Sequence, residues 1–219
     1  PCMLKLVMRQ KHAVRVFVGD MHQQIYSFRH VCNPFIILQN HATMYSLTRS
    51  FRYGPHVAMM SSQFLRDFKN EHIEIISESE YDTLITSCKV GMIGSNVAYL
   101  SRTNKYLMER AIEFSRQGKK FHIINRGFDF KKERTMIREL LRLRDGASTT
   151  HAKLSQFTNL EQAYDAFKQL KNTKWMNRIQ ICMNHGDVWP DVEENHVDDP
   201  SLVNIFLCTA HGSKGLEFD

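Results

Sequence analysis

The sequence predicts an α/β protein built on a parallel sheet with flanking helices. Segments with helical spacing of apolar residues alternate with short β-prone runs. Each of these runs is followed at once by a cluster of polar residues, and the runs are 14–18, 44–47, 97–100 and 203–208. Because parallel sheets place functional loops at the carboxyl ends of their strands, four repeats of one arrangement favour this architecture over ordinary strand-to-turn punctuation.

Helices are expected between the β-prone runs. Capping residues, proline and glycine mark four of them: after Pro55, from Asn104 to Gly118, over 136–143, and after a capping box formed by Thr158 and Glu161. Their apolar stripes are expected to face the core. Two stretches look less regular: 127–134 is rich in lysine and arginine between aromatic residues, and the acidic stretch 185–200 is expected to be a surface segment or a helix edge.

Composition narrows the class of protein. The 219 residues are 42% hydrophobic, which suffices for a core, and the net charge of +6 weakly favours a polyanionic partner. The five cysteines are odd in number and show no C-x-x-C spacing, so we expect neither a disulfide scaffold nor a metal site. An intracellular reducing compartment fits this usage. No apolar run is long enough to cross a bilayer, so no membrane partner is expected.

The first polar cluster, 19–29, suits binding of phosphate and of single-stranded nucleic acid. The amide of Gln23 can donate to a phosphate oxygen without adding charge, so it can sense a terminal phosphate. Tyr26 and Phe28 offer stacking platforms for unpaired bases, and Arg29 can hold the backbone. The alternative is a strand with two core aromatic residues and a surface arginine.

The second cluster, 47–53, contains an aromatic residue beside an arginine. A guanidinium such as that of Arg52 can stabilise the charge that builds up in phosphoryl transfer. The alternative is that Arg49 and Arg52 are surface charges at a helix start and that Phe51 belongs to the core.

The third cluster, 101–104, offers polar side chains to phosphates, among them Arg102 and Asn104. Asn104 can also serve simply as a helix cap, and the two roles can coexist. In the fourth cluster, 209–219, Gly212 and Gly215 permit a close approach of the backbone to phosphate.

Taken in chain order, the four clusters resemble the motor motifs of UvrD/Rep-like superfamily 1 DNA helicases. The matching patterns are G-D-x-x-Q-x-I-Y-x-F-R at 19–29, an aromatic-arginine pair at 51–52, R-T-N at 102–104 and T-x-H-x-x-K-G-L-E-F-D at 209–219. The resemblance implies a RecA-like, P-loop NTPase-type fold. Residues 1–38 would close the first lobe, and 39–219 would form most of the second, with a reduced accessory insertion at about 126–200. The motor is incomplete here, because Walker A and D-E-x-x-D patterns do not occur in the sequence.

The resemblance also implies an ATP-dependent 3′-to-5′ helicase acting on single-stranded DNA and duplex junctions. Its cofactors would be ATP and Mg²⁺, with the Mg²⁺ ligands outside this sequence. The implied nucleotide-binding residues are Gln23, Phe51, Arg52, Gly215 and Glu217, of which Gln23 and Arg52 would be catalytic. The implied DNA-binding residues are Tyr26, Phe28, Arg29, Arg102, Asn104, Thr209 and His211. His30 departs from the family, which usually has glycine at that position.

Within this family the motif forms resemble those of the eukaryotic F-box DNA helicases. That resemblance implies a nuclear protein of DNA repair or recombination, with ubiquitin-ligase components as partners. The chain by itself is expected not to hydrolyse ATP. Two other interpretations remain open: a non-catalytic DNA-binding paralogue that kept these motifs, and the helicase portion of a helicase-nuclease.

Overall fold

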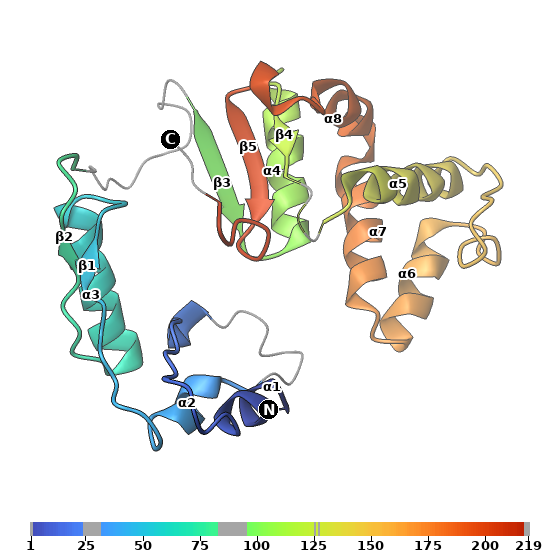
Figure 1. Ribbon diagram of the computed structural model, residues 1–219. Coiled ribbons are helices and arrows are strands. Elements are labelled where there is room, and N and C mark those ends of the chain that lie inside the picture. Colours follow the sequence, from blue (N-terminus) through green and yellow to red (C-terminus); the bar gives the residue numbers. More distant parts are fainter. Residues whose placement is uncertain (1, 24–31, 83–95, 125, 127, 217–219) are drawn as a thin grey trace. The chain divides into compact units, whose positions relative to one another are not determined.

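The computed structural model of the chain describes residues 2–23, 32–82, 96–124, 126 and 128–216 (Figure 1). The chain forms two compact units, Pro1–Lys89 and Val90–Asp219, hereafter unit 1 and unit 2. Each unit is described by itself. The expected lobe boundary near residue 38 and the accessory insertion at about 126–200 stay predictions.

Unit 1 is built around one long helix and two very short strands. Its elements are α1 (Cys2–Met8), η1 (Met21–Gln23), α2 (Pro34–Leu38), β1 (Arg49–Ser50), α3 (Pro55–Lys69) and β2 (Ile76–Ser77). The strands β1 and β2 pair in parallel. Helix α3 begins at Pro55 as expected, and it ends at Asn70, which adopts a left-handed conformation with a φ of 53°.

The strand expected at 14–18 is wrong, because these residues form no regular element. The side chains of Val14, Val16 and Val18 are 96%, 80% and 79% exposed. A strand needs a hydrogen-bonded neighbour and apolar cover, and none of the described strands of unit 1 pairs with this run. The second run, 44–47, forms no regular element either, and pairing starts only at Arg49.

Unit 2 contains a three-stranded sheet in which all the strands are parallel. The strands are β3 (Val97–Ser101), β4 (His122–Ile123) and β5 (Ile205–Thr209), in the spatial order β3-β5-β4. The pairing of β3 with β5 extends over five residue pairs, from Val97 opposite Ile205 to Ser101 opposite Thr209. The strands expected from the third and fourth runs are therefore confirmed, together with the α/β class and its parallel pairing.

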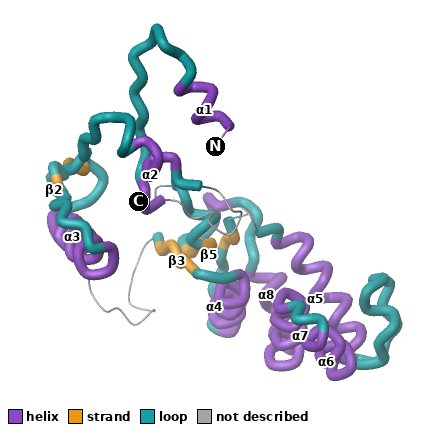
Figure 2. The backbone as a smooth tube through the Cα atoms, turned by 90° about the horizontal axis from the view of Figure 1, so that it is seen from below, coloured by secondary structure: helices purple, strands orange, loops and turns teal. Residues whose placement is uncertain are grey.

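Helices and short turns make up the rest of unit 2. They are α4 (Asn104–Arg116), α5 (Phe130–Arg144), α6 (Leu160–Gln169), α7 (Thr173–His185), η3 (Gly186–Val188), α8 (Trp189–Asn195) and η4 (Pro200–Leu202). Helix α4 packs on β3 and β5, and α5 to α8 gather beside it (Figure 2). None of the helices in the described residues is long and apolar enough to cross a membrane.

Two expected helix starts are shifted by one residue. Thr103, and not Asn104, caps α4, since its hydroxyl accepts a hydrogen bond of 3.3 Å from the backbone N–H of Tyr106. The expected capping box at Thr158 lies one residue later, because Asn159 accepts from the N–H of Gln162 at 2.9 Å. Threonine and asparagine are both good caps, so the sequence pattern alone did not separate neighbouring candidates.

The two less regular stretches contribute residues to the core of unit 2. Phe128 and Phe130 flank Asp129, the cap of α5, and are 4% and 1% exposed. In the acidic stretch, Trp189 and Val192 are 2% and 0% exposed on one face of α8. Three-residue spacing puts these two side chains on the same helix face, while the acidic residues occupy the remainder.

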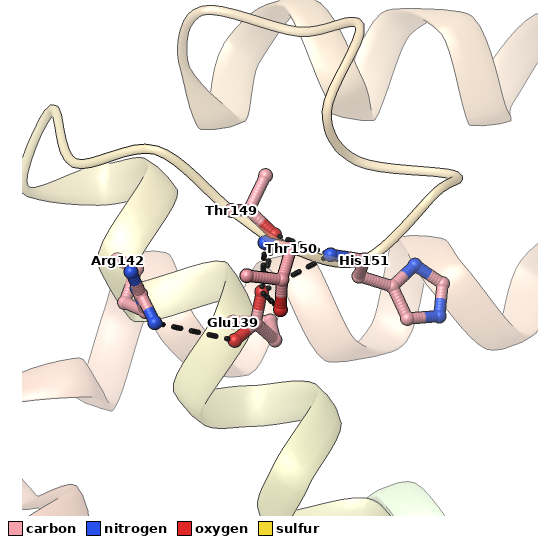
Figure 3. A network of polar contacts seen from close by, with 5 residues as sticks. All are labelled: Glu139, Arg142, Thr149, Thr150 and His151. Carbon is pink, nitrogen blue, oxygen red and sulfur yellow. Dashed lines mark hydrogen bonds and ion pairs between the residues drawn. The ribbon is translucent and has the colours of Figure 1, made fainter.

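Two carboxylates of α5 stabilise the packing of unit 2, one by an ion pair to another helix and one by hydrogen bonds to a loop. Glu133 on α5 makes a bidentate pair with Arg178 on α7, at 2.5 and 2.6 Å, and both side chains are largely buried. Glu139 on α5 holds the loop that follows the helix (Figure 3). One of its oxygens accepts hydrogen bonds from the hydroxyls of Thr149 and Thr150 and from the backbone N–H groups of Thr150 and His151.

Candidate nucleic-acid interface

The pairing of β3 with β5 brings two of the predicted motifs together in unit 2. Ser101 lies opposite Thr209 at the ends of these strands, and the N–H of Ala210 donates to the carbonyl of Ser101 at 2.9 Å. The segments 101–104 and 209–216 therefore leave the sheet beside each other (Figure 1). We name the surface formed by these two segments together with Arg126 the carboxyl edge.

The turn after β5 is held together by Thr209. This residue is 8% exposed, and its hydroxyl accepts a hydrogen bond of 3.1 Å from the N–H of Gly212. Its carbonyl accepts from the N–H of Ser213 at 2.9 Å. The side chain of Thr209 thus shapes the turn, and direct contact with DNA stays a prediction. His211, between Thr209 and Gly212, is partly exposed.

Two glycines of this turn serve different purposes. A Cβ on Gly212 would lie 2.7 Å from the carbonyl oxygen of Arg126, a contact that real Cβ atoms essentially never make. Glycine at this position lets the turn touch the segment that follows β4. Gly215 has a φ of +76°, and a Cβ there would meet nothing within 4 Å, so its requirement is conformational. Close contact with a nucleotide at Gly215 stays a prediction.

Polar and basic groups collect at the carboxyl edge. Arg102, Asn104, Arg126 and Lys214 are exposed there. Helix α4 starts at this edge, so the positive end of its dipole points the same way. Because Thr103 caps α4, the amide of Asn104 is not the cap. The arrangement can attract and bind the phosphates of a nucleic acid.

Arg126 was not among the residues expected from the sequence. It follows the two-residue strand β4, which was too short to be recognised from its apolar run. The position of Arg126 becomes apparent only from the parallel pairing of β4 with β5. An arginine just after a third parallel strand lies at the same sheet edge as the polar residues after the other two.

The first motif lies in unit 1 and is described only as far as Gln23. The amide of Gln23 donates to Asp20 at 3.0 Å, and the N–H of His22 donates to the same carboxylate at 2.8 Å. The imidazole of His22 lies 2.8 Å from Glu71, in the segment after α3. Tyr26, Phe28, Arg29 and His30 fall outside the described residues, as does Glu217 at the end of the fourth motif.

The second motif presents an aromatic ring to solvent. Phe51 is 75% exposed, so the alternative of a core phenylalanine is wrong. Arg52 is also exposed, two residues before the buried Gly54, where a Cβ would lie 2.4 Å from the Cα of Asp82. Arg49 makes a surface ion pair of 3.1 Å with Glu78. An exposed phenyl ring beside an arginine can stack on a base and contact its phosphates.

Unit 1 does not bring its two predicted phosphate-binding residues together. Arg52 precedes α3, whereas Gln23 lies in the segment tied to Glu71 behind α3. The 15 residues of α3 separate these ends by roughly 22 Å at 1.5 Å per residue. As far as the motifs are described, two of them form one assembled surface, the carboxyl edge of unit 2, and the two in unit 1 lie apart.

A metal centre is not part of these sites as far as the structure describes them. No group of three or more histidine, cysteine, aspartate or glutamate side chains among the described residues is placed to hold a metal ion. The groups that the sequence predicts to contact phosphate are amides, hydroxyls, guanidinium groups and backbone N–H groups.

The fold and the carboxyl edge define a mixed α/β protein whose parallel sheet gathers basic and polar groups at one edge. Over its whole length the chain is 29% identical to a Schizosaccharomyces pombe protein named F-box DNA helicase protein 1, and it spans 27% of that protein. It is 26% identical to F-box DNA helicase 1 of Gallus gallus and spans 22% of it. These similarities support a helicase-related family. No protein-family model and no solved structure matches the chain.

Proposed function

We propose that this chain is part of an ATP-dependent 3′-to-5′ DNA helicase of the UvrD/Rep-like superfamily 1, with RecA-like lobes. The observation that carries the proposal is the parallel pairing of β3 with β5, which assembles the third and fourth motifs into one edge. Full-length similarity to two proteins named as DNA helicases supports it. The chain spans about a quarter of their length, so the activity belongs to the whole protein.

In this proposal the carboxyl edge holds single-stranded DNA by its phosphates. Arg102 supplies charge, and Asn104 and His211 supply hydrogen-bonding groups next to the amino end of α4. Thr209 and Gly212 act by positioning the turn that carries His211. Tyr26, Phe28 and Arg29 would add base stacking and a further phosphate contact.

The residues of the second motif fit a nucleotide. The exposed ring of Phe51 is available to stack on adenine, and Arg52 would contact phosphate oxygens. Gln23 lies near the opposite end of α3, so its proposed phosphate contact requires a rearrangement of unit 1. We also propose that Glu217 contacts the ribose of the nucleotide and that Gly215 permits a close approach of the backbone to phosphate. Bound ATP with Mg²⁺ supplies the free energy of phosphate-bond hydrolysis, and the Mg²⁺ ligands are assigned to the remainder of the protein.

The names of the relatives suggest further partners. We propose duplex junctions as the DNA substrate and a role in repair or recombination in the nucleus. Ubiquitin-ligase components are proposed only from the word F-box in the relatives' names.

ATP hydrolysis by the whole protein, measured with and without single-stranded DNA, tests the proposal. Arg52→Ala should lower the DNA-stimulated rate by about 1,000-fold, because a guanidinium that stabilises transferring phosphate contributes about that much. Arg49→Ala is the matched control, since Arg49 makes only a surface pair with Glu78 and should leave the rate unchanged. A protein without DNA-stimulated turnover, or an equal loss in both variants, would refute the proposed role.

A further inference from the structure

The turn between α6 and α7 concentrates positive charge. We name residues 168–174 the lysine turn. Its three lysines, Lys168, Lys171 and Lys174, are all exposed. No carboxylate among the described residues lies within 4.0 Å of their ammonium groups. By contrast, the exposed arginines of α5, such as Arg138 and Arg144, have carboxylate partners.

Lys171 occupies a position that disfavours lysine. The N–H of Asn172 donates to Phe167 at 2.9 Å, and that of Lys171 donates to Lys168 at 3.0 Å, so α6 ends in a Schellman motif. The residue after the cap in this motif is left-handed, and Lys171 has a φ of 51°. Glycine is the usual residue there because it has no Cβ to clash.

The other helix ends of the chain make the contrast clear. In the described part of the chain, four helices are followed by a left-handed residue: α3 by Asn70 (φ 53°), α4 by Gly118 (φ 63°), α5 by Gly146 (φ 74°) and α6 by Lys171 (φ 51°). Glycine and asparagine tolerate this conformation best. Only α6, within this set, carries a long charged side chain at the position.

Lys174 is unfavourably placed as well. It lies in the first turn of α7, where the helix dipole is positive and acidic residues are preferred. The first turn of α7 contains no acidic residue. Two of the three lysines therefore occupy positions that favour other residues. Glycine would suit the left-handed position of Lys171, and a carboxylate would suit the first helical turn at Lys174.

Two nearly buried aromatic rings flank the lysine turn in the sequence. The rings of Phe167 and Trp175 stack at 5.1 Å with an interplanar angle of 8°, and both are nearly buried. Arg178 lies over the ring of Trp175 at 5.1 Å and is paired with Glu133. The lysine turn and the carboxyl ends of β3 and β5 point toward the lower side of unit 2 in Figure 1.

We infer that the lysine turn is a second contact for the phosphodiester backbone of DNA, in addition to the carboxyl edge. This inference rests on the proposed function. Ammonium groups on flexible stems bind phosphates as point charges and do not read bases, so the contact is independent of sequence and sensitive to salt. Leu170, which is 73% exposed, adds apolar surface to the turn and would also suit an acidic peptide. The test therefore includes that outcome.

Fluorescence anisotropy with a labelled oligothymidine, titrated at several salt concentrations, measures the contact. The test variant Lys171→Gly with Lys174→Gln removes two charges and places the preferred residue at the left-handed position, so it should fold. The matched control, Lys119→Gln with Lys120→Gln, removes two charges just before β4, at the amino end of the sheet. A third variant, Arg102→Gln, probes the carboxyl edge.

The lysine-turn variant should bind about ten-fold more weakly at ~0.1 M salt. Its slope of log affinity against log salt should fall by about 1.4, since each single-strand phosphate contact contributes about 0.7. The control should bind nearly as well as the natural sequence. Equal binding by the lysine-turn variant and the natural sequence, or an equal loss in the control, would overturn the inference.

The remaining outcomes separate the inference from the proposed function. If Arg102→Gln weakens binding while the lysine-turn variant does not, DNA binding by the carboxyl edge is supported and the lysine turn is refuted as a second contact. If the natural sequence binds no oligothymidine even at low salt, DNA binding is refuted for both the carboxyl edge and the lysine turn. If poly-L-glutamate binds the natural sequence and loses affinity only in the lysine-turn variant, with DNA binding unchanged, the partner is an acidic protein and the DNA assignment is wrong.

Discussion

The two units show the same sequence pattern with different structural results. In unit 2, the apolar runs ending at Ser101 and Thr209 pair over five residues and pack under α4. In unit 1, the run 14–18 stays exposed, and α3 leaves Phe64 and Phe68 55% and 70% exposed. An apolar run followed by a polar cluster becomes a buried strand only where other elements pair with it and cover it.

Truncating one aromatic ring in each unit should give the largest contrast. Phe114 is 1% exposed in the core of unit 2, whereas Phe68 in unit 1 is 70% exposed. Phe114→Ala should lower the free energy of unfolding of unit 2 by about 3–5 kcal/mol, because it leaves a cavity. Phe68→Ala should change stability by less than about 0.5 kcal/mol.

Urea unfolding measures both effects. Both tryptophans of the chain, Trp175 and Trp189, lie in unit 2, so their fluorescence reports that unit alone, while circular dichroism reports the whole chain. A loss from Phe68→Ala as large as that from Phe114→Ala would mean that the exposed face of α3 is covered in solution. That result would contradict the contrast between a buried core in unit 2 and an exposed aromatic face in unit 1.

A second contrast concerns ion pairs inside unit 2. Glu133→Gln should destabilise the unit by about 3 kcal/mol, since it leaves the guanidinium of Arg178 buried without its carboxylate. Glu113→Gln removes the partner of Arg110 in an exposed pair and should cost less than about 1 kcal/mol. Adding Arg178→Met to Glu133→Gln should recover most of the loss. Tryptophan fluorescence in urea again provides the measurement, and failure of the double variant to recover would assign the cost to packing.

Acid should weaken unit 2 through His196. Burial lowers the pKa of this imidazole from 6.5 to about 4; nearby His122, Arg134 and Lys131 also lower it, and Asp198 opposes them. The unfolded chain binds the proton below about pH 6.5, but the folded unit does so only near pH 4. Stability is therefore lost as the pH falls through this window, by about 2 kcal/mol between pH 6.5 and 5.

His196→Phe should flatten this pH dependence. The Nε2 atom of His196 is buried without a hydrogen-bond partner among the described residues, and its ring already lies 4.3 Å from that of Phe130, so a phenyl ring fits. Glu139, whose pKa is lowered chiefly by the hydroxyl of Thr149, contributes stability that is lost as the pH falls below about 4.5. Unfolding free energies at pH 6.5 and 5 thus isolate His196. An unchanged pH dependence in His196→Phe would assign the effect to other groups.

The smallest effect is expected at the end of α6. Lys171→Gly should stabilise unit 2 by about 1 kcal/mol, since it relieves the left-handed lysine. Gly118→Lys, the reverse change at the end of α4, should destabilise by a similar amount. Thermal unfolding of the two variants checks the signs. Destabilisation by Lys171→Gly would show that the lysine itself supports the turn.

The sequence predicted those elements whose signals are long and local. The strands at Val97–Ser101 and Ile205–Thr209 and the helix at Pro55 follow from apolar runs and capping residues. It missed β4 because two residues carry no periodic signal, and with β4 it missed Arg126. For the stretch 185–200 the sequence indicated only a surface segment or a helix edge, because the acidic residues concealed a buried helix face made by two side chains, Trp189 and Val192.

The candidate site likewise has features that the sequence could predict and features that it could not. Residues 102–104 and 209–211 could be grouped from motif order, and the register of β3 with β5 confirms that they are neighbours. The burial of Thr209 and the close contact of Gly212 with Arg126 could not be predicted, because both depend on the three-dimensional path of the turn.

The strand order of unit 2 has a consequence for synthesis on the ribosome. Among the described residues, β3 and β4 pair only with β5, which is the last of the three strands to be translated. The nascent chain therefore carries two strands without their shared partner until residues 205–209 emerge. Such non-local pairing is slow and leaves strand edges open in the meantime. A ribosome stalled just before this stretch should hold unit 2 in a form that proteases cut readily.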